Sequence, residues 1–167
     1  FSSLLALCNI FLIYRFVKSQ TSHIIAILSA IIVSISAEYW IIAKAVITDM
    51  TLGLCFNATL MGFYMGYTRH KEHAPHYKIY YLSAYIASAI AVLTKGPIGI
   101  LLPGLIILVY LIIRKDLREL LSLQLIPGLF ILLTLGGSWY YYMYATHGND
   151  FVNVFLGVHN WLRATVS

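Results

Sequence analysis

The segment 91–113, "AVLTKGPIGILLPGLIILVYLII", contains two strongly apolar runs separated by one lysine, Lys95, with glycine and proline directly after it. The second run, Ile98 to Ile113, has no charged side chain. Long apolar runs without charges are typical of helices in a lipid bilayer. This segment therefore predicts two membrane helices joined by a short polar break that holds the lysine.

The rest of the chain has the same character. Of its 167 residues, 60% are hydrophobic and 10% are charged, whereas about 25% of the residues of a soluble domain are charged. We predict an all-α fold: a single transmembrane domain over residues 1–167, built as a polytopic bundle of about six membrane helices. The six apolar runs are Phe1 to Val17, Ile24 to Trp40, Met50 to Tyr67, Ile79 to Thr94, Ile98 to Ile113 and Leu120 to Tyr144.

Motifs of several soluble enzyme classes are missing from the sequence. It has no phosphate-binding P-loop, no dinucleotide fingerprint, no nucleophilic serine elbow and no zinc-protease motif. Cys8 and Cys55 stand singly in apolar runs, so they predict neither a disulfide framework nor a metal knuckle. The histidines of "HKEHAPHYK" are not interpreted as metal ligands, because Pro75 interrupts any helix there.

The distribution of positive charge predicts an orientation. Eight of the 11 lysines and arginines fall in alternate breaks, and three fall in the others. Because lysine and arginine accumulate in cytoplasmic loops, the first set is expected to face the cytoplasm as solvated turns, and the second to face the opposite side. The first set is Arg15, Lys18, Arg69, Lys71, Lys78, Arg114, Lys115 and Arg118; the second is Lys44, Lys95 and Arg163.

Lys95 is the first candidate for a functional role. Gly96 removes a side chain beside it, and Pro97 suits the first turn of the next helix, so the lysine is expected at a helix start. Free amides at a helix N-terminus and a nearby ammonium group attract phosphate. The alternative is a lysine whose ammonium reaches from a helix end to the lipid headgroups.

Three further charged residues lie in the preceding break on the same side. Asp49 opens a helix, where it and Thr48 are suited to capping; alternatively, its carboxylate faces Lys95 across the bundle and binds a sugar, a metal ion or an acceptor. Glu38 and Lys44 flank this break and either pair with each other or contribute to the site.

Residues 145–167 are expected to form a periplasmic juxtamembrane segment. Apolar residues recur at a helical spacing from Phe151 to Val158, which predicts an amphipathic helix in the membrane interface. Its polar side chains, which include His147, Asp150, His159 and Arg163, would lie near the outer mouth. His159 and Arg163 would form a cationic pair able to hold a phosphate. Tyr142, in the aromatic run "SWYYYMY", belongs to an interfacial belt or hydrogen-bonds a headgroup.

Three segments together resemble a known family: "AVITDMTLGLCFNATLMGFY" (45–64), "AVLTKGPIGILLPGLIIL" (91–108) and "WYYYMYATHGNDFVNVFLGVHNWLRAT" (139–165). They are similar to bacterial lipid-linked-sugar transferases. The resemblance is closest to the lipid A aminoarabinose transferases and their relatives in the dolichyl-phosphate-mannose protein mannosyltransferase group, glycosyltransferase family 39.

The resemblance implies a GT-C glycosyltransferase of the bacterial inner membrane. Such an enzyme moves a sugar, with inversion, from a polyprenyl-phosphate carrier to lipid A or another cell-envelope acceptor on the periplasmic face. It implies that Asp49 is a supporting acid and that Lys95 lies near the carrier phosphate, while His159 and Arg163 match the tail of the pattern. No cofactor is required by it, although a divalent cation could bind, and no nucleic acid partner is expected.

The resemblance also implies what this chain lacks. The family's main catalytic acid lies in a large periplasmic loop that precedes the matching part, so the chain is expected to be an inactive piece without that loop and without the C-terminal part. Two alternative functions stay open: a protein O-mannosyltransferase-like enzyme of the same group, and a segment of a secondary transporter. No second copy of the Lys-Gly-Pro feature supports a transporter repeat.

Overall fold

The computed structural model describes residues 1–45 and 48–152, and throughout these ranges the regular elements are helices. Their order along the chain is α1 (Ser2–Gln20), α2 (His23–Ile35), α3 (Ala37–Lys44), α4 (Asp49–Lys71), α5 (Tyr77–Lys95), α6 (Ile98–Ile113), the 3₁₀ helix η1 (Leu117–Leu121), α7 (Leu125–Ile131), the π-helical stretch η2 (Leu132–Gly136) and α8 (Gly137–Val152).

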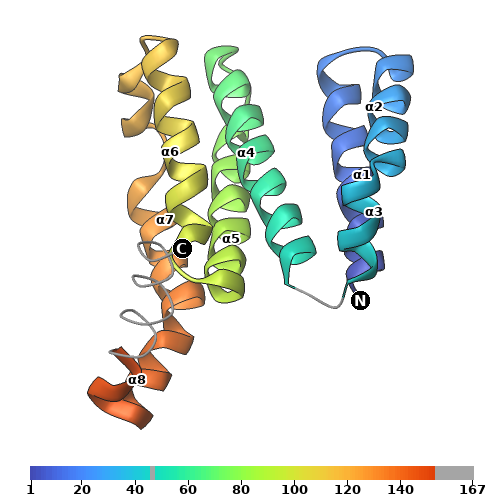
Figure 1. The fold of residues 1–167 in the computed structure, drawn as a ribbon. Coiled ribbons are helices and arrows are strands. Elements are labelled where there is room, and N and C mark those ends of the chain that lie inside the picture. Colours follow the sequence, from blue (N-terminus) through green and yellow to red (C-terminus); the bar gives the residue numbers. More distant parts are fainter. Residues whose placement is uncertain (46–47, 153–167) are drawn as a thin grey trace.

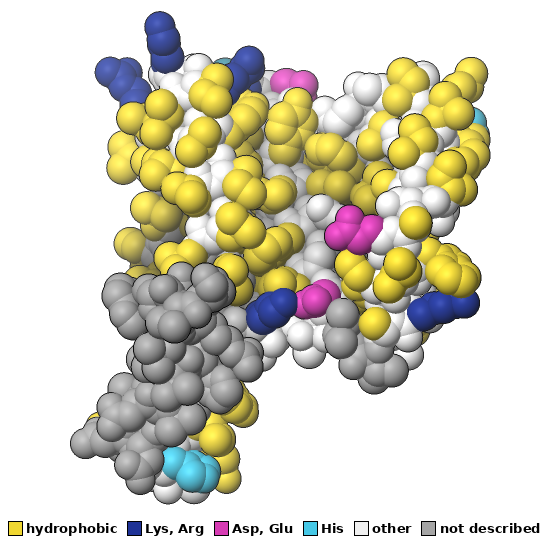
Figure 2. All heavy atoms as spheres, in the orientation of Figure 1, with side chains coloured by type: hydrophobic (Ala, Val, Ile, Leu, Met, Phe, Trp, Pro, Cys, Tyr) yellow, Lys and Arg dark blue, Asp and Glu magenta, His cyan; other side chains and the backbone are white. Residues whose placement is uncertain are grey.

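The helices run up and down beside one another (Figure 1). The turns after α1, α4 and α6 lie at one end, which we call the basic end because it holds the lysine- and arginine-rich breaks. The junctions before α4 and after α5 lie at the opposite end, which we call the Lys95 end. Figure 2 shows Lys and Arg side chains at both ends and mainly hydrophobic side chains between them. The two sets of breaks predicted from the charge pattern are therefore separated in space.

The prediction of about six membrane helices is not confirmed. Among the described residues, two helical stretches are long and apolar enough to cross a membrane, Ser2–Gln20 and Leu125–Gly148. A third span is obtained if α2 and α3, which meet at an angle of 64°, count as one broken helix. The other apolar runs do form helices, but α6 has 16 residues and is shorter than the roughly 20 needed to span a bilayer. Helices α4 and α5 are long enough, but polar residues lower their hydropathy.

Small residues bring α4 and α5 into close contact. A Cβ atom added to Gly66 would lie 2.7 Å from the ring of Tyr81, and one added to Gly62 would lie 3.2 Å from the Cβ of Ala84. The spacing of these two glycines is the small-residue pattern that lets helix backbones approach. Asn57, also on α4, donates from Nδ2 to Oδ1 of buried Asn9 at 2.9 Å and ties α4 to α1.

The charge pattern predicts that the turns at the basic end are solvated, but one of them contains a buried carboxylate. The side chain of Glu119 in η1 is 2% exposed. Its Oε1 accepts a hydrogen bond from the Tyr81 hydroxyl at 2.6 Å and lies 2.6 Å from His70 Nδ1. Lys71 Nζ lies 3.5 Å from the other oxygen of Glu119 and 2.5 Å from Asp116 Oδ2. A buried carboxylate needs such partners, because desolvation without them costs several kcal/mol.

Two further contacts complete this cluster. The Tyr67 hydroxyl donates to Asp116 at 3.1 Å, and the His70 ring stacks on Tyr77 with 4.4 Å between centroids. The Lys71 ammonium bonded to Asp116 holds the pKa of that carboxyl below its usual value. We call this cluster the Glu119 network; its polar members are Tyr67, His70, Lys71, Tyr81, Asp116 and Glu119. It attaches η1 to α4 and α5 next to the aromatic core of the bundle.

Candidate functional site

An ion pair joins two helix ends at the Lys95 end of the bundle. Lys95 Nζ lies 2.5 Å from Asp49 Oδ1. The lysine is the last residue of α5 and the aspartate is the first of α4. Both charges suit their helix dipoles, because a carboxylate is favoured at an N-terminus and an ammonium at a C-terminus. The structure thus brings together two residues that the sequence placed in different breaks.

The pair is open to an incoming anion. The side chain of Lys95 is 50% exposed and that of Asp49 is 40% exposed. An ammonium group has three hydrogen-bond donors, and the bond to Asp49 uses one of them. Lys95 can therefore donate to a phosphate oxygen while it stays beside the carboxylate.

The sequence predicts Lys95 at a helix start, and this prediction is wrong. Lys95 ends α5, and Gly96 follows with φ 84° and donates its amide hydrogen to the Val92 carbonyl at 2.8 Å. Such a positive φ favours glycine. Pro97 precedes α6 as predicted, but the amides of Gly99 and Ile100 already bond to the carbonyls of Gly96 and Pro97 at 3.0 and 3.1 Å. The ammonium, rather than a set of free amides, is what this corner offers a phosphate.

Tight packing fixes the corner between α5 and α6. A Cβ atom on Gly99 would lie 2.3 Å from the backbone nitrogen of Val92, so a side chain has no space there. Ser88 donates from Oγ to the Gly99 carbonyl at 3.1 Å. From α8, the Tyr140 hydroxyl donates to the Val92 carbonyl at 2.9 Å. Contacts with two other helices, α6 and α8, therefore hold the end of the helix that carries Lys95.

The start of α4 is not stabilised by side-chain capping, the first of the two roles considered for Thr48 and Asp49. Thr48 is the N-cap residue, but its side chain makes no capping hydrogen bond, and Asp49 pairs with Lys95 instead. Lys44 packs its ammonium over the Trp40 ring at 3.5 Å from the centroid. It also lines a space of about 290 Å³ together with Thr48 and Thr51. Glu38 is exposed on α3, and the structure records no ion pair between these two charged side chains of α3.

The aromatic residues of α8 contribute a second space near this corner. Tyr142 is 67% exposed and lines a space of about 480 Å³ with Leu93, Ser138 and Trp139. Leu93 lies two residues before Lys95, so this space borders the end of α5. His147 is exposed on α8, and within the described residues no contact joins it to the ion pair.

Several predicted site residues are not covered by the structural description. His159 and Arg163 lie outside the described residues, as does most of the segment 145–167, and the side chain of Asp150 lies outside them as well. Across residues 1–45 and 48–152 no group of three or more His, Cys, Asp or Glu is placed to hold a metal ion. The Glu119 network is the cluster that sequence reasoning missed. The signal available for it was a histidine and a lysine in the break "TRHKEHAPHYK" and two acidic residues in the break "RKDLRE", which was expected on the same side.

The model of the dolichyl-phosphate-mannose-protein mannosyltransferase family matches residues 1–152. The chain belongs to this family. The match includes both members of the ion pair and confirms the resemblance seen in the sequence. Membership agrees with the apolar helices in assigning the chain to membrane proteins.

Two proteins of Aquifex aeolicus (strain VF5), both described as uncharacterized, are similar in sequence to this mannosyltransferase-family chain. One is 34% identical over 131 residues, which are 78% of this chain and 25% of that protein. The other is 30% identical over 164 residues, which are 98% of this chain and 35% of that protein. The chain therefore spans about a quarter to a third of the length of these relatives.

Crystal structures of ArnT from Cupriavidus metallidurans have the same fold over this length. The apo structure gives a TM-score of 0.81 at 23% identity and covers 93% of this chain and 29% of ArnT. The structure bound to undecaprenyl phosphate gives 0.83 at 23% identity, with 96% and 29% covered. The helical arrangement of this family member is thus that of part of a GT-C fold.

Proposed function

We propose that the full-length protein is a membrane glycosyltransferase that takes a sugar from a polyprenyl-phosphate carrier. It passes the sugar, with inversion, to lipid A or another cell-envelope acceptor on the periplasmic face of a bacterial inner membrane. The observation that carries this proposal is the exposed ion pair of Lys95 and Asp49 in a chain of the mannosyltransferase family. ArnT, a protein of the same fold, binds undecaprenyl phosphate, which supports a carrier of that chemical class.

Lys95 has a defined role in this reaction. The acceptor oxygen attacks the anomeric carbon, the bond from that carbon to the phosphate oxygen breaks, and the phosphate leaves with both bonding electrons. Its negative charge therefore grows in the transition state. An ammonium group already held at that position stabilises the growing charge without reorganisation. The fixed end of α5 provides this preorganisation, because Gly99 and Tyr140 hold it in place.

Asp49 positions Lys95 and serves as a supporting acid. A hydroxyl acceptor must lose a proton to a carboxylate, whereas a lipid A phosphate is already ionised and needs no base. The main base for a hydroxyl acceptor is expected elsewhere in the full-length protein. Lys44 and Tyr142 are proposed to contact the substrates from the two neighbouring spaces that they line. Glu38 is proposed to do so from α3, and His147, His159 and Arg163 from the segment that follows.

The test uses the full-length protein with Lys95→Ala, Lys95→Arg and a control, Lys78→Ala, which removes an exposed lysine at the opposite end. Transfer is measured by mass spectrometry of lipid A and of surface proteins, and binding of undecaprenyl phosphate is measured separately. We expect Lys95→Ala to reduce transfer by about 10²–10³-fold, as for the loss of one preorganised donor. We expect Lys95→Arg to retain part of the activity and Lys78→Ala to retain all of it.

The readouts also separate the competing functions. A sugar missing from surface proteins rather than from lipid A would assign a protein acceptor. Normal transfer by a well-expressed Lys95→Ala protein would refute the proposed role of the ion pair. Movement of an intact solute that depends on Lys95, without any glycosylated product, would instead identify a transporter.

A further inference from the structure

We propose that the basic end carries a binding site for one anionic phospholipid, with the headgroup on Lys115 and Arg118 and an acyl chain in the apolar cavity between α6 and α7. This site is separate from the ion pair of Lys95 and Asp49, and the proposal does not depend on the glycosyltransferase function.

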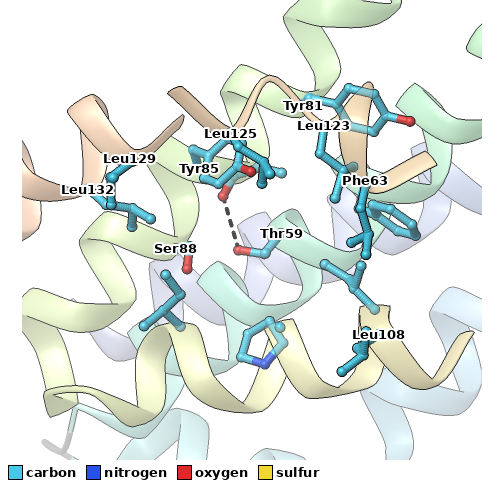
Figure 3. A pocket seen from close by; sticks show the side chains of 16 residues that line it. Thr59, Phe63, Tyr81, Tyr85, Ser88, Leu108, Leu123, Leu125, Leu129 and Leu132 are labelled. Atoms are coloured by element: carbon cyan, nitrogen blue, oxygen red, sulfur yellow. Dashed lines mark hydrogen bonds between the residues drawn. The ribbon is translucent and has the colours of Figure 1, made fainter. Parts of the chain in front are cut away.

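The first observation is the cavity itself. It has a volume of about 490 Å³, within the roughly 300–1,000 Å³ of sites that hold small organic ligands. Side chains of α4, α5, α6, η1 and α7 line it, among them Thr59 and Phe63 of α4 and Leu129 of α7 (Figure 3). Three wall residues, Leu108, Leu125 and Leu129, are between 39% and 56% exposed. The cavity therefore opens on the surface formed by the described helices.

The shape and chemistry of the cavity fit a hydrocarbon chain. Its α6 wall extends from Ile100 to Leu108, a rise of about 12 Å at roughly 1.5 Å per residue. Three of the four hydroxyl side chains in the lining, Thr59, Ser88 and Tyr81, already donate a hydrogen bond, to the Cys55 carbonyl at 2.8 Å, the Gly99 carbonyl at 3.1 Å and Glu119 at 2.6 Å; the fourth is Tyr85. Burying an unpaired polar group would be costly, so an apolar chain suits this space better than a sugar or a nucleotide.

The second observation is the charge of the turn that precedes η1, the element whose Leu120 lines the cavity. The segment "RKDLRE", residues 114–119, has three basic and two acidic residues. Both acidic side chains turn inward into the Glu119 network, with 21% exposure for Asp116 and 2% for Glu119. Lys115 and Arg118 are exposed. The surface of this turn is therefore more positive than the net charge of its residues suggests. Figure 2 shows Lys and Arg side chains projecting from this end.

The charged turn and the cavity are adjacent in the fold. Leu120 of η1 lines the cavity and lies two residues after Arg118. Basic side chains attract anionic headgroups by about 1 kcal/mol each near a membrane surface, and an apolar chain adds about 0.8 kcal/mol per buried CH₂ group. A phospholipid matches both parts at once. The sugar carrier is a less suitable occupant, because the proposed cation for its phosphate, Lys95, lies at the other end.

The experiment measures lipid binding to the detergent-purified full-length protein by native mass spectrometry. Phosphatidylglycerol and phosphatidylcholine with identical acyl chains are titrated separately. We expect selective retention of phosphatidylglycerol. The double substitution Lys115→Gln/Arg118→Gln should weaken its binding by about 25-fold, since each cation contributes roughly a factor of five. The control Arg15→Gln/Lys18→Gln, which removes two cations of the same end on α1, should change it less than twofold.

A second pair of variants tests the cavity. Gly104 lines it, and a Cβ atom added there meets nothing within 4 Å, so Gly104→Leu is chosen to add side-chain volume at this wall of the cavity. Gly53 on α4 has equally open surroundings but does not line the cavity. We expect Gly104→Leu to abolish retention of phosphatidylglycerol and Gly53→Leu to leave it unchanged.

Four outcomes would overturn the proposal. Equal retention of the two phospholipids would remove the role of the cations, as would equal effects of the two double substitutions. Full binding by Gly104→Leu would remove the role of the cavity. Displacement of phosphatidylglycerol by undecaprenyl phosphate would identify the sugar carrier as the occupant. If Gly104→Leu does not fold, the Lys115→Gln/Arg118→Gln protein, which alters exposed residues only, still tests whether the site binds an anionic phospholipid.

Discussion

Lys95, the last residue of α5, forms an ion pair with Asp49, the first residue of α4, across 2.5 Å. The two residues are 46 positions apart in the chain, and they meet because α4 and α5 are antiparallel neighbours. The pair therefore depends on the packing of these two helices, and the first prediction concerns the division of labour within it.

Asp49→Asn should separate carrier binding from sugar transfer. The amide removes the negative charge that competes with a phosphate for the Lys95 ammonium, so undecaprenyl phosphate should bind at least as tightly as in the wild type. Transfer should fall by about 100-fold, as when a catalytic group is misplaced by about 1 Å, because Asp49 no longer positions Lys95. Binding and rate are measured on the same full-length preparation. Weaker carrier binding together with unchanged transfer would contradict the roles given to both residues.

Glu119→Ala should strongly destabilise the bundle. It leaves the buried Tyr81 hydroxyl without its acceptor and the His70 ring without the carboxylate beside it, while Lys71 keeps its contact with Asp116. An unsatisfied buried group costs about 1–3 kcal/mol, and more where a charge is involved. Thermal unfolding in detergent measures the loss. As a control, Glu72→Gln alters an exposed carboxylate of the neighbouring turn and should remain within about 0.5 kcal/mol of the wild type. Equal midpoints for the two variants would mean that the Glu119 network does not stabilise the fold.

Two glycines of α6 should respond in opposite directions to alanine. Gly99→Ala places a Cβ atom 2.3 Å from the Val92 nitrogen, and such overpacking costs about 1–3 kcal/mol. Gly104→Ala meets nothing within 4 Å and should gain up to about 1 kcal/mol of helix propensity. Unfolding midpoints measure both changes. A stable Gly99→Ala protein would show that α5 and α6 separate easily, and Lys95 would then not be held in place.

The contact of Lys71 with Asp116 should depend on pH. The folded pKa of Asp116 lies below its ordinary value, which is about 3.9, so the contact stabilises the folded protein above about pH 4 and is lost as the pH falls through the folded pKa. Asp116→Asn should therefore unfold at a lower temperature than the wild type at pH 7. The difference should shrink as the pH falls below about 4. A difference that grows in acid would reverse the assigned sign.

The sequence was sufficient for the helical class, the family and the separation of the two sets of breaks. The first two follow from long apolar runs and local motifs, and the third from the alternation of charge along the chain. Asp49 facing Lys95 was one of two alternatives, because a residue at a helix start can cap it or pair across the bundle. Only the packing of α4 on α5 decides between these.

Other features could not be predicted from local patterns. The helix end at Lys95 depends on the backbone conformation of Gly96. Because glycine adopts positive and negative φ about equally well, its presence does not decide whether the helix ends there. The burial of Glu119 depends on His70 and Tyr81, which lie 49 and 38 positions away. The prediction of about six spans is not confirmed, because apolar runs that form helices need not be long or apolar enough to cross a bilayer.

The π-helical stretch Leu132–Gly136 sets which face of α8 meets α5. A π turn accommodates an extra residue within a helix, and each residue of an α-helix turns the chain by about 100°. Deleting Thr134 would therefore rotate the following aromatic run by about that angle and carry the Tyr140 hydroxyl away from the Val92 carbonyl. A neighbouring ring would be presented to α5 in its place, so the length of this stretch, as much as its composition, selects the aromatic side chain that contacts the Val92 carbonyl.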